Sequence, residues 1–157
     1  MKHNTKDRLF EVFNKVNGIK ISENIESIVN KSTNSVGISI INDFIHFVDS
    51  ELGLNGILPE IEYSYDENEA SENKSFGGYI PNEKKIRIVL IKRNLADSLR
   101  SLAHELVHHK QNLEGKIKSA KDGETGSEIE NDANAKAGIL MRNFGKINPK
   151  IYEIIFT

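Results

Sequence analysis

The sequence predicts an α+β fold in which a small antiparallel sheet of about three strands packs against helices. Two observations predict it. Apolar residues recur at helical spacing before residue 53 and after residue 94, and between these positions they alternate with polar residues or form short runs bounded by turns. The length of 157 residues suits one hydrophobic core, and a hydrophobic fraction of 38% suffices to build it. We therefore expect one domain over residues 1–157.

Residues 5–53 are expected to be mainly helical. Thr5 is suited to capping a first short helix, and the polar segment 31–35 predicts a turn. From residue 36 to residue 52, isoleucine, valine and leucine recur three or four positions apart, which indicates a second amphipathic helix. Gly53 is suited to ending that helix.

The sheet is expected within residues 58–91. Its first strand is predicted at 59–65, where apolar and polar residues alternate as in a half-buried strand. The acidic stretch 66–73 follows and predicts a loop.

Two further strands are predicted to form an antiparallel hairpin. Residues 75–80 and 85–91 flank a polar segment that begins with Pro81, a residue favoured in turns. We expect 75–80 to be an edge strand, because Gly77 and Gly78 leave room for another backbone to approach.

Two helices are predicted in the last third of the chain. The first spans 95–113, with Asn94 as its cap and a stripe of leucines that faces the core. The second spans 128–143 and is capped by Ser127. The apolar tail 151–156 is expected to pack back on the domain.

The 95–113 helix carries the pattern His104-Glu105-Leu-Val-His108. Residues four apart lie one turn apart on the same face of a helix, so both imidazoles can reach one metal ion about 2 Å from each ring. Glu105 is rotated beside them. The chain contains no cysteine, so any metal site must use histidines and carboxylates. We therefore predict a zinc site on His104 and His108.

Catalytic zinc needs a third protein ligand, which the last helix can supply. Glu128 and Glu130 both lie in its first turn. We favour Glu130, because the small Ala133 lets the two helices approach and the Asn134 amide can hold the second ring nitrogen of a histidine. Two alternatives stay open: Glu128 is the competing ligand, and Ser127 with Glu130 also fits a capping box.

These two segments resemble the ligand motifs of zincin metallopeptidases of gluzincin type. The resemblance lies in residues 102–111, which read Leu-Ala-His-Glu-Leu-Val-His-His-Lys-Gln, and in residues 130–138, which read Glu-Asn-Asp-Ala-Asn-Ala-Lys-Ala-Gly. It covers about residues 75–145. Within this group, the chain is most similar to small metallopeptidases encoded in phage genomes. The resemblance implies a zincin-like fold.

The resemblance also implies roles for individual residues. Zinc is expected on His104, His108 and Glu130, with Glu105 as the general base. Asn134 is expected to hydrogen-bond to one of the histidine ligands without binding the ion. Such a site would hydrolyse peptide bonds with a metal-activated water.

Three further residues are considered for positions at or near the site. Tyr79 and Tyr152 are candidates to stabilise the oxyanion, with ordinary packing as the alternative. His109 points about 100° away from His108 around the helix, so we expect it to be a solvated neighbour of the site.

The leading function is therefore a zinc-dependent metallopeptidase acting on a peptide or protein. The alternative is a zinc-stabilised binding or structural module without efficient turnover, such as a phage accessory or virion protein. A net charge of -2 makes nucleic acid an unlikely main partner. No apolar stretch is long enough for a signal peptide or a membrane span, so we expect a cytoplasmic protein, with virion association as the other option. The weaker nucleic-acid hypothesis rests on Lys84, Lys85, Arg87, Lys92 and Arg93.

Overall fold

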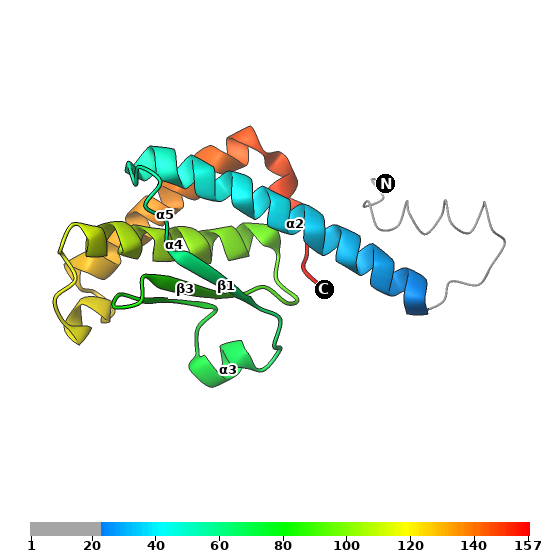
Figure 1. Ribbon diagram of the computed structural model, residues 1–157, viewed down its shortest axis with the longest axis horizontal. Helices are drawn as coiled ribbons and strands as arrows, with labels where there is room; N and C mark the ends of the chain where they lie inside the picture. The colour runs from blue at the N-terminus through cyan, green and yellow to red at the C-terminus, as the bar shows by residue number, and fades with distance from the viewer. Residues whose placement is uncertain (1–22) are drawn as a thin grey trace.

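The computed structural model describes residues 23–157 and confirms the α+β fold class (Figure 1). The helix predicted after Thr5 lies outside the described residues. The elements are α2 (Glu23–Leu52), β1 (Glu60–Ser64), α3 (Glu69–Asn73), β2 (Gly77–Ile80), β3 (Lys85–Val89), α4 (Leu95–Leu113), η1 (Ala120–Gly123), α5 (Glu128–Ile147) and η2 (Pro149–Tyr152), where η denotes a short 3₁₀ helix.

The first described helix is continuous. α2 has no break between its ends, so the turn predicted at 31–35 is wrong. That segment contains no Gly or Pro, and its side chains find partners without disturbing the helix. Thr33 Oγ1 donates to the carbonyl one turn earlier at 3.1 Å, and the Asn34 amide pairs with the backbone of Thr157 at the far end of the chain. Local bonding and a tertiary contact thus offset the low helix propensity of these residues.

The sheet has three strands in the order β1-β3-β2, and it is mixed. β2 and β3 form the predicted antiparallel hairpin, but β1 pairs with β3 in parallel, so the prediction of an antiparallel sheet is wrong for β1. At the start of β1, the Glu60 amide donates to the Lys84 carbonyl at 3.0 Å, just before β3 begins. Both strands therefore start at the same end of the sheet. β2 lies at an edge, as predicted.

Part of the acidic stretch that we expected to be a loop forms the short helix α3. Its first residue, Glu69, is largely buried. The Glu69 carboxylate accepts hydrogen bonds from the hydroxyl of Ser64 in β1 and the guanidinium of Arg87 in β3. These contacts hold α3 against the face of the sheet that is turned away from α4 (Figure 1).

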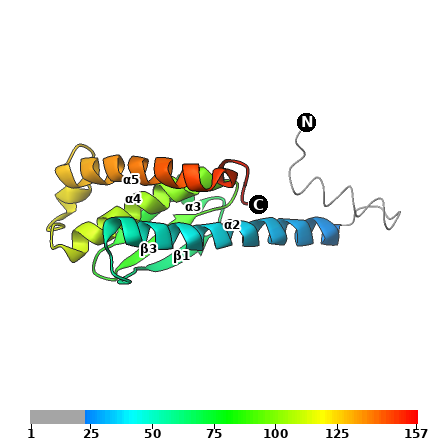
Figure 2. The ribbon, with the colours of Figure 1, turned by 90° about the horizontal axis from the view of Figure 1, so that it is seen from above.

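α4 lies at the centre of the molecule, between the sheet on one side and α2 and α5 on the other (Figures 1 and 2). Its predicted bounds are confirmed. The predicted cap is also present, since Asn94 Oδ1 accepts from the Ala96 amide at 2.8 Å. No helix within residues 23–157 combines the length and the apolar character needed to cross a bilayer.

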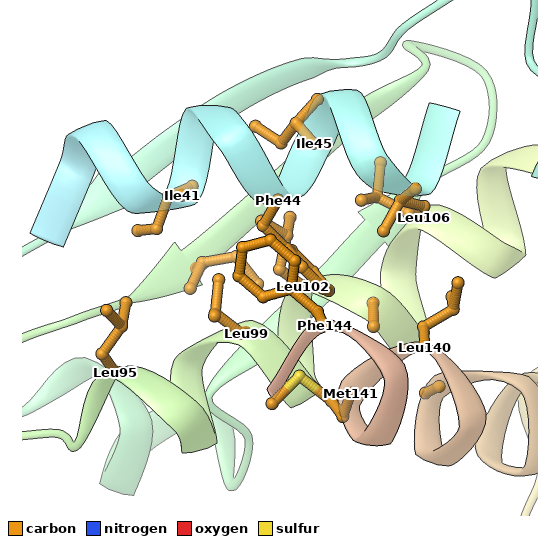
Figure 3. Packing of buried hydrophobic residues seen from close by; sticks show 14 of the residues in the cluster. Ile41, Phe44, Ile45, Leu95, Leu99, Leu102, Leu106, Leu140, Met141 and Phe144 are labelled. Carbon is orange, nitrogen blue, oxygen red and sulfur yellow. The ribbon is translucent and has the colours of Figure 1, made fainter. Parts of the chain in front are cut away.

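The hydrophobic core fills the space between α2, α4 and α5 (Figure 3). Leu99 and Leu102 of α4 meet Phe44 of α2 and Phe144 of α5 there, and all four are buried. The two phenylalanine rings pack edge to face with centroids 5.0 Å apart. Burying each such side chain stabilises the fold by about 1.5–3 kcal/mol. This packing also fixes the position of the face of α4 that carries His104 and His108.

α5 extends beyond its predicted end near residue 143 and continues to Ile147. Gly145 lies inside the helix. A Cβ at this position would lie 2.5 Å from the Tyr152 hydroxyl, so the glycine makes room for the Tyr152 side chain. The tail packs back on the domain as predicted, with Phe156 fully buried.

Candidate metal centre

Two helices bring three predicted ligands together. His104 and His108 lie one turn apart on α4, and Glu130 lies in the first turn of α5, which packs against α4. Glu130 Oε1 is 2.9 Å from His104 Nε2, Glu130 Oε2 is 3.1 Å from His108 Nε2, and the two Nε2 atoms are 3.0 Å apart. Each residue therefore directs one ligand atom to a common space.

The arrangement fits a tetrahedral zinc ion. Zinc bonds of about 2.0–2.1 Å place tetrahedral ligand atoms about 3.3 Å apart, close to the 2.9 to 3.1 Å between the ligand atoms here. Two imidazoles and one carboxylate are also a donor set that zinc enzymes use. Among residues 23–157, no fourth His, Asp or Glu joins the group, so one tetrahedral position would stay open.

Hydrogen bonds assign the tautomer of His108. Gln111 Nε2 donates to the Ile129 carbonyl at 3.0 Å and to Asp132 Oδ2 at 2.9 Å, so Gln111 Oε1 faces His108 Nδ1, at 2.8 Å. Because an amide oxygen only accepts, His108 Nδ1 carries the proton and Nε2 presents a lone pair to the site. Asp132 in turn accepts from Lys136 Nζ at 3.1 Å.

His104 is held by residues of α5. Burial and the neighbouring His108 ring lower the pKa of His104, and they outweigh the opposing effects of the Glu130 carboxylate and of a hydrogen bond with the Asn134 side chain. A neutral imidazole is the form that binds a metal. The Asn134 side chain thus lies where the sequence predicted it, against a candidate ligand histidine.

The structure directs Glu130 to the histidines and leaves Glu128 exposed. Ser127 caps α5 as predicted, since its hydroxyl accepts from the Glu130 amide at 3.1 Å. The Ser127 amide donates to the Glu124 carbonyl at 3.1 Å, so it does not need the Glu130 carboxylate as the second half of a capping box. The geometry therefore supports neither Glu128 as the third ligand nor a capping-box role for the Glu130 carboxylate.

Glu105 lies beneath strand β2, beside the three candidate ligands. Only 8% of it is exposed, and burial, together with the charge of Glu130, raises its pKa to about 8. Gly77 packs directly over this region: a Cβ there would lie only 2.9 Å from Ile88 Cδ1 and at ordinary contact distance, 3.5 Å, from Glu105 Oε1. A carboxyl group with a pKa near neutrality is suited to taking up and releasing protons.

The site opens into a cleft of about 880 Å³ between β2, α4, α5 and η1. The Val89 amide donates to the Phe76 carbonyl at 2.9 Å, which together with the strand register shows which β2 residues face β3. Alternate residues of an antiparallel strand face its partner, so the backbone groups of Gly77 and Tyr79 point to the free edge. Both residues line the cleft, and Gly78 does not.

His109 is fully buried, so the prediction of a solvated neighbour is wrong. Its Nε2 donates to the Ile57 carbonyl at 2.8 Å, which leaves Nδ1 to accept from the Tyr79 hydroxyl at 2.9 Å. That hydroxyl also accepts from Asn112 Nδ2 at 2.9 Å. Tyr79 therefore ties β2 to α4 with the hydroxyl that we considered for the oxyanion. Tyr152, the other candidate, does not line the cleft.

Gln111 is the site residue that the sequence analysis missed. It is 2% exposed, which is unusual for a glutamine. A signal was available, because a residue three positions after His108 lies on the same face of the helix. Its importance depends on Ile129 and Asp132, which only the docking of α5 brings into contact with it.

Comparison of the chain with protein-family models, with curated proteins and with solved structures finds no match. Three features of the site bear on its function: the converging ligand atoms, the buried carboxyl group beside them, and the cleft on which both open.

The first prediction separates the two glutamates. Glu130→Ala should lower zinc affinity by more than about 100-fold. This exceeds the usual loss of affinity when a residue that only hydrogen-bonds to a metal ligand is removed. Glu128→Ala should change it less than about 3-fold, although it removes the same charge from the same helix turn and so has the same effect on the helix dipole. Competition with a chelating dye measures both. The reverse order would transfer the ligand role to Glu128.

The second prediction concerns Gln111. Gln111→Ala removes the acceptor that holds the His108 ring, so zinc affinity should fall about 10- to 100-fold. Asn112→Ala is a matched control, because this neighbouring amide bonds to Tyr79 and the Pro81 carbonyl rather than to a ligand. Equal losses in the two variants, with melting temperatures matched, would show that Gln111 has no specific effect on the site.

The third prediction follows from the raised pKa of Glu105. The folded metal-free protein holds this proton from about pH 5 up to about pH 8, whereas the unfolded chain releases it near pH 4.5. The free energy of unfolding should therefore fall with rising pH across this window, on the order of 1–4 kcal/mol. In Glu105→Gln this fall in the free energy of unfolding should be absent.

Urea denaturation in the presence of a chelator, at pH 5, 6.5 and 8, tests the difference between wild type and variant. The lowered pKa of His104 has the opposite effect on stability, since a histidine that is neutral when folded stabilises more as pH rises, and it cancels in this difference. Parallel curves for the two proteins would contradict the prediction.

Proposed function

We propose that this protein is a zinc-dependent metallopeptidase of the zincin type that hydrolyses peptide bonds in a peptide or protein. The supporting observation is that three converging ligands and a buried carboxyl group open on the same cleft. Structural zinc sites are closed by four protein ligands, whereas catalytic sites keep a position for water or substrate. The described part of the chain supplies three ligands, which favours the catalytic interpretation.

In this proposal His104, His108 and Glu130 hold the ion, and Glu105 moves protons. Zinc, when bound, supplies Lewis acidity that polarises a carbonyl and lowers the pKa of water. The Glu105 carboxylate accepts a proton from the attacking water and delivers it to the nitrogen of the leaving amine. Its pKa of about 8 belongs to the metal-free site, and a nearby positive charge lowers it toward the range of a general base.

The free edge of β2 offers a place for the substrate backbone. An extended peptide can add to such an edge through main-chain hydrogen bonds. The outward groups of Tyr79 are available, whereas those of Gly77 are engaged by Ser75, whose hydroxyl donates to the Gly77 carbonyl at 2.6 Å and accepts from its amide at 3.3 Å. A substrate would pair with Tyr79 and displace the Ser75 hydroxyl at Gly77.

The basic residues considered for nucleic acid give that alternative little support. Acidic neighbours neutralise several of them, which weakens attraction to a phosphate backbone. The salt bridges join Lys85 to Glu62, Arg87 to Glu62 and Glu69, and Lys92 to Glu67.

Glu105→Gln tests the proposed function. The variant should keep the fold and bind zinc within about 3-fold of wild type, because this residue is not a ligand. Hydrolysis of a fluorescently labelled casein by the zinc-loaded protein should fall by about 10²- to 10⁴-fold or more, the range expected when a general acid–base is removed. Glu128→Gln, a matched change at an exposed glutamate that does not line the cleft, should leave hydrolysis unchanged.

Undiminished hydrolysis by Glu105→Gln would remove this residue from the mechanism. A wild-type protein that binds zinc, gains thermal stability from it and hydrolyses neither casein nor a mixed peptide pool would overturn the peptidase proposal. That result would favour the zinc-stabilised binding or structural module, since an ion on these three residues also joins α4 to α5.

A further inference from the structure

We propose that the end of the cleft at Arg100 binds a carboxylate of the substrate, so that the enzyme prefers peptides with an acidic group close to the cleaved bond. The inference deepens the proposed peptidase function and rests on it. It starts from the position of Arg100, which lines the same cleft as the candidate ligands.

Arg100 belongs to the helix face that carries the histidines. It precedes His104 by four residues and His108 by eight, so the three side chains lie along one side of α4, one turn apart. Neighbours at this spacing have Cβ atoms about 5–6 Å apart. Arg100 therefore lies one turn from the candidate ligands on the wall of the same cleft, and a guanidinium does not act as a zinc ligand.

Arg100 is the only lysine or arginine among the described residues that line the cleft. It is exposed, and no hydrogen bond or salt bridge joins it to another residue within 23–157. The other charged groups on these walls already have roles or partners. Glu105 and Glu130 belong to the metal centre, and Asp122 accepts from the amides of Lys118 and Ser119 at 2.7 and 3.0 Å.

The wall next to Arg100 is fixed by a second arginine. Arg93 stacks over the Phe76 ring at 4.1 Å and donates to the Ser101 hydroxyl at 3.1 Å. It also donates to the carbonyls of Val89 and Asp97, both at 3.2 Å. Arg93 is thus used within the fold, whereas Arg100 keeps its donors for a ligand. Phe76 and Ser101 line the cleft beside it.

The spacing places the recognised group near the reacting bond. One helical turn separates Arg100 from His104, and an extended peptide advances about 3.3 Å per residue, so the guanidinium reaches a group within about two residues of the cleaved bond. A guanidinium matches a carboxylate with two parallel hydrogen bonds. That carboxylate can come from an Asp or Glu side chain or from the C-terminus of the substrate, and the two sources share the same chemistry.

The activity test begins with a pool of synthetic peptides of random sequence, whose products are identified by mass spectrometry. A cleaved peptide is then made in matched forms, with Glu or Gln at the enriched position and with a free or amidated C-terminus. The form that carries the recognised carboxylate should have a kcat/KM at least about 10-fold above its amide partner, as expected for a hydrogen bond between charged groups. The pair that shows this ratio identifies the source.

Substitutions then assign the preference to Arg100. Arg100→Gln should reduce the ratio below about 3-fold without lowering zinc content, and Arg100→Glu should favour Lys at the same position, because the sign of the local charge is reversed. Arg142→Gln is the control, since this exposed arginine of α5 does not line the cleft. A wild-type enzyme without the preference, or a preference that persists in Arg100→Gln, would overturn the inference while leaving the peptidase function intact.

A binding measurement keeps the two proposals separable. The peptide pool is passed over immobilised, zinc-loaded Glu105→Gln protein, and the retained peptides should be enriched in the same carboxylate. The enrichment should vanish when Arg100→Gln is added to Glu105→Gln. Retention without that enrichment would contradict the role of Arg100, whether or not the wild type cleaves the pool.

Discussion

The packing of α4 between the sheet, α2 and α5 sets the position of every candidate ligand. A helix that is buried on several sides can neither rotate nor slide without opening cavities in the core, and such cavities cost roughly 2–5 kcal/mol for each large side chain that loses its contacts. Leu99 and Leu102 fix one face of α4 in this way. The histidine face then meets α5, where Ala133 and Ala137 are buried and small enough to let Glu130 approach.

This packing collects groups that repel one another in the absence of a metal. Two imidazole nitrogens and a carboxylate converge within 3.1 Å, and Glu105 is buried beside them. Unpaired buried charge and facing lone pairs are unfavourable unless other groups compensate for them. Gln111 and Asn134 supply part of the compensation by holding the two rings from outside. A cation supplied to the centre would provide the remainder.

The sheet edge and the metal centre are joined by the same few contacts. Gly77 lies within van der Waals reach of Glu105, and the Tyr79 hydroxyl ties the next outward-facing residue of β2 to His109 of α4. The edge strand β2 is therefore tied to α4, the helix that carries two of the candidate ligands. In the proposed peptidase, this coupling would fix the distance between an edge-bound substrate and the metal centre, which is what positioning in catalysis requires.

The sequence by itself determined the features that depend on local spacing. The span of α4, the Asn94 and Ser127 caps, the hairpin, and the pair His104 and His108 on one helix face all follow from periodicity and from residue types near each other in the chain. The α+β class follows from the same patterns. The geometric preference for Glu130 over Glu128 required more, because one residue of α5 turns toward α4 and the other toward solvent only after the two helices dock.

Tertiary structure decided whatever depends on partners far apart in the sequence. α2 stays continuous through residues that locally favour a turn, with Asn34 bonded to Thr157, and β1 runs parallel to β3 because Glu60 enters the sheet beside Lys84. The burial of His109 likewise needs Ile57 and Tyr79, from two other segments. In each case the free energy that selects the conformation comes from contacts that no local pattern contains.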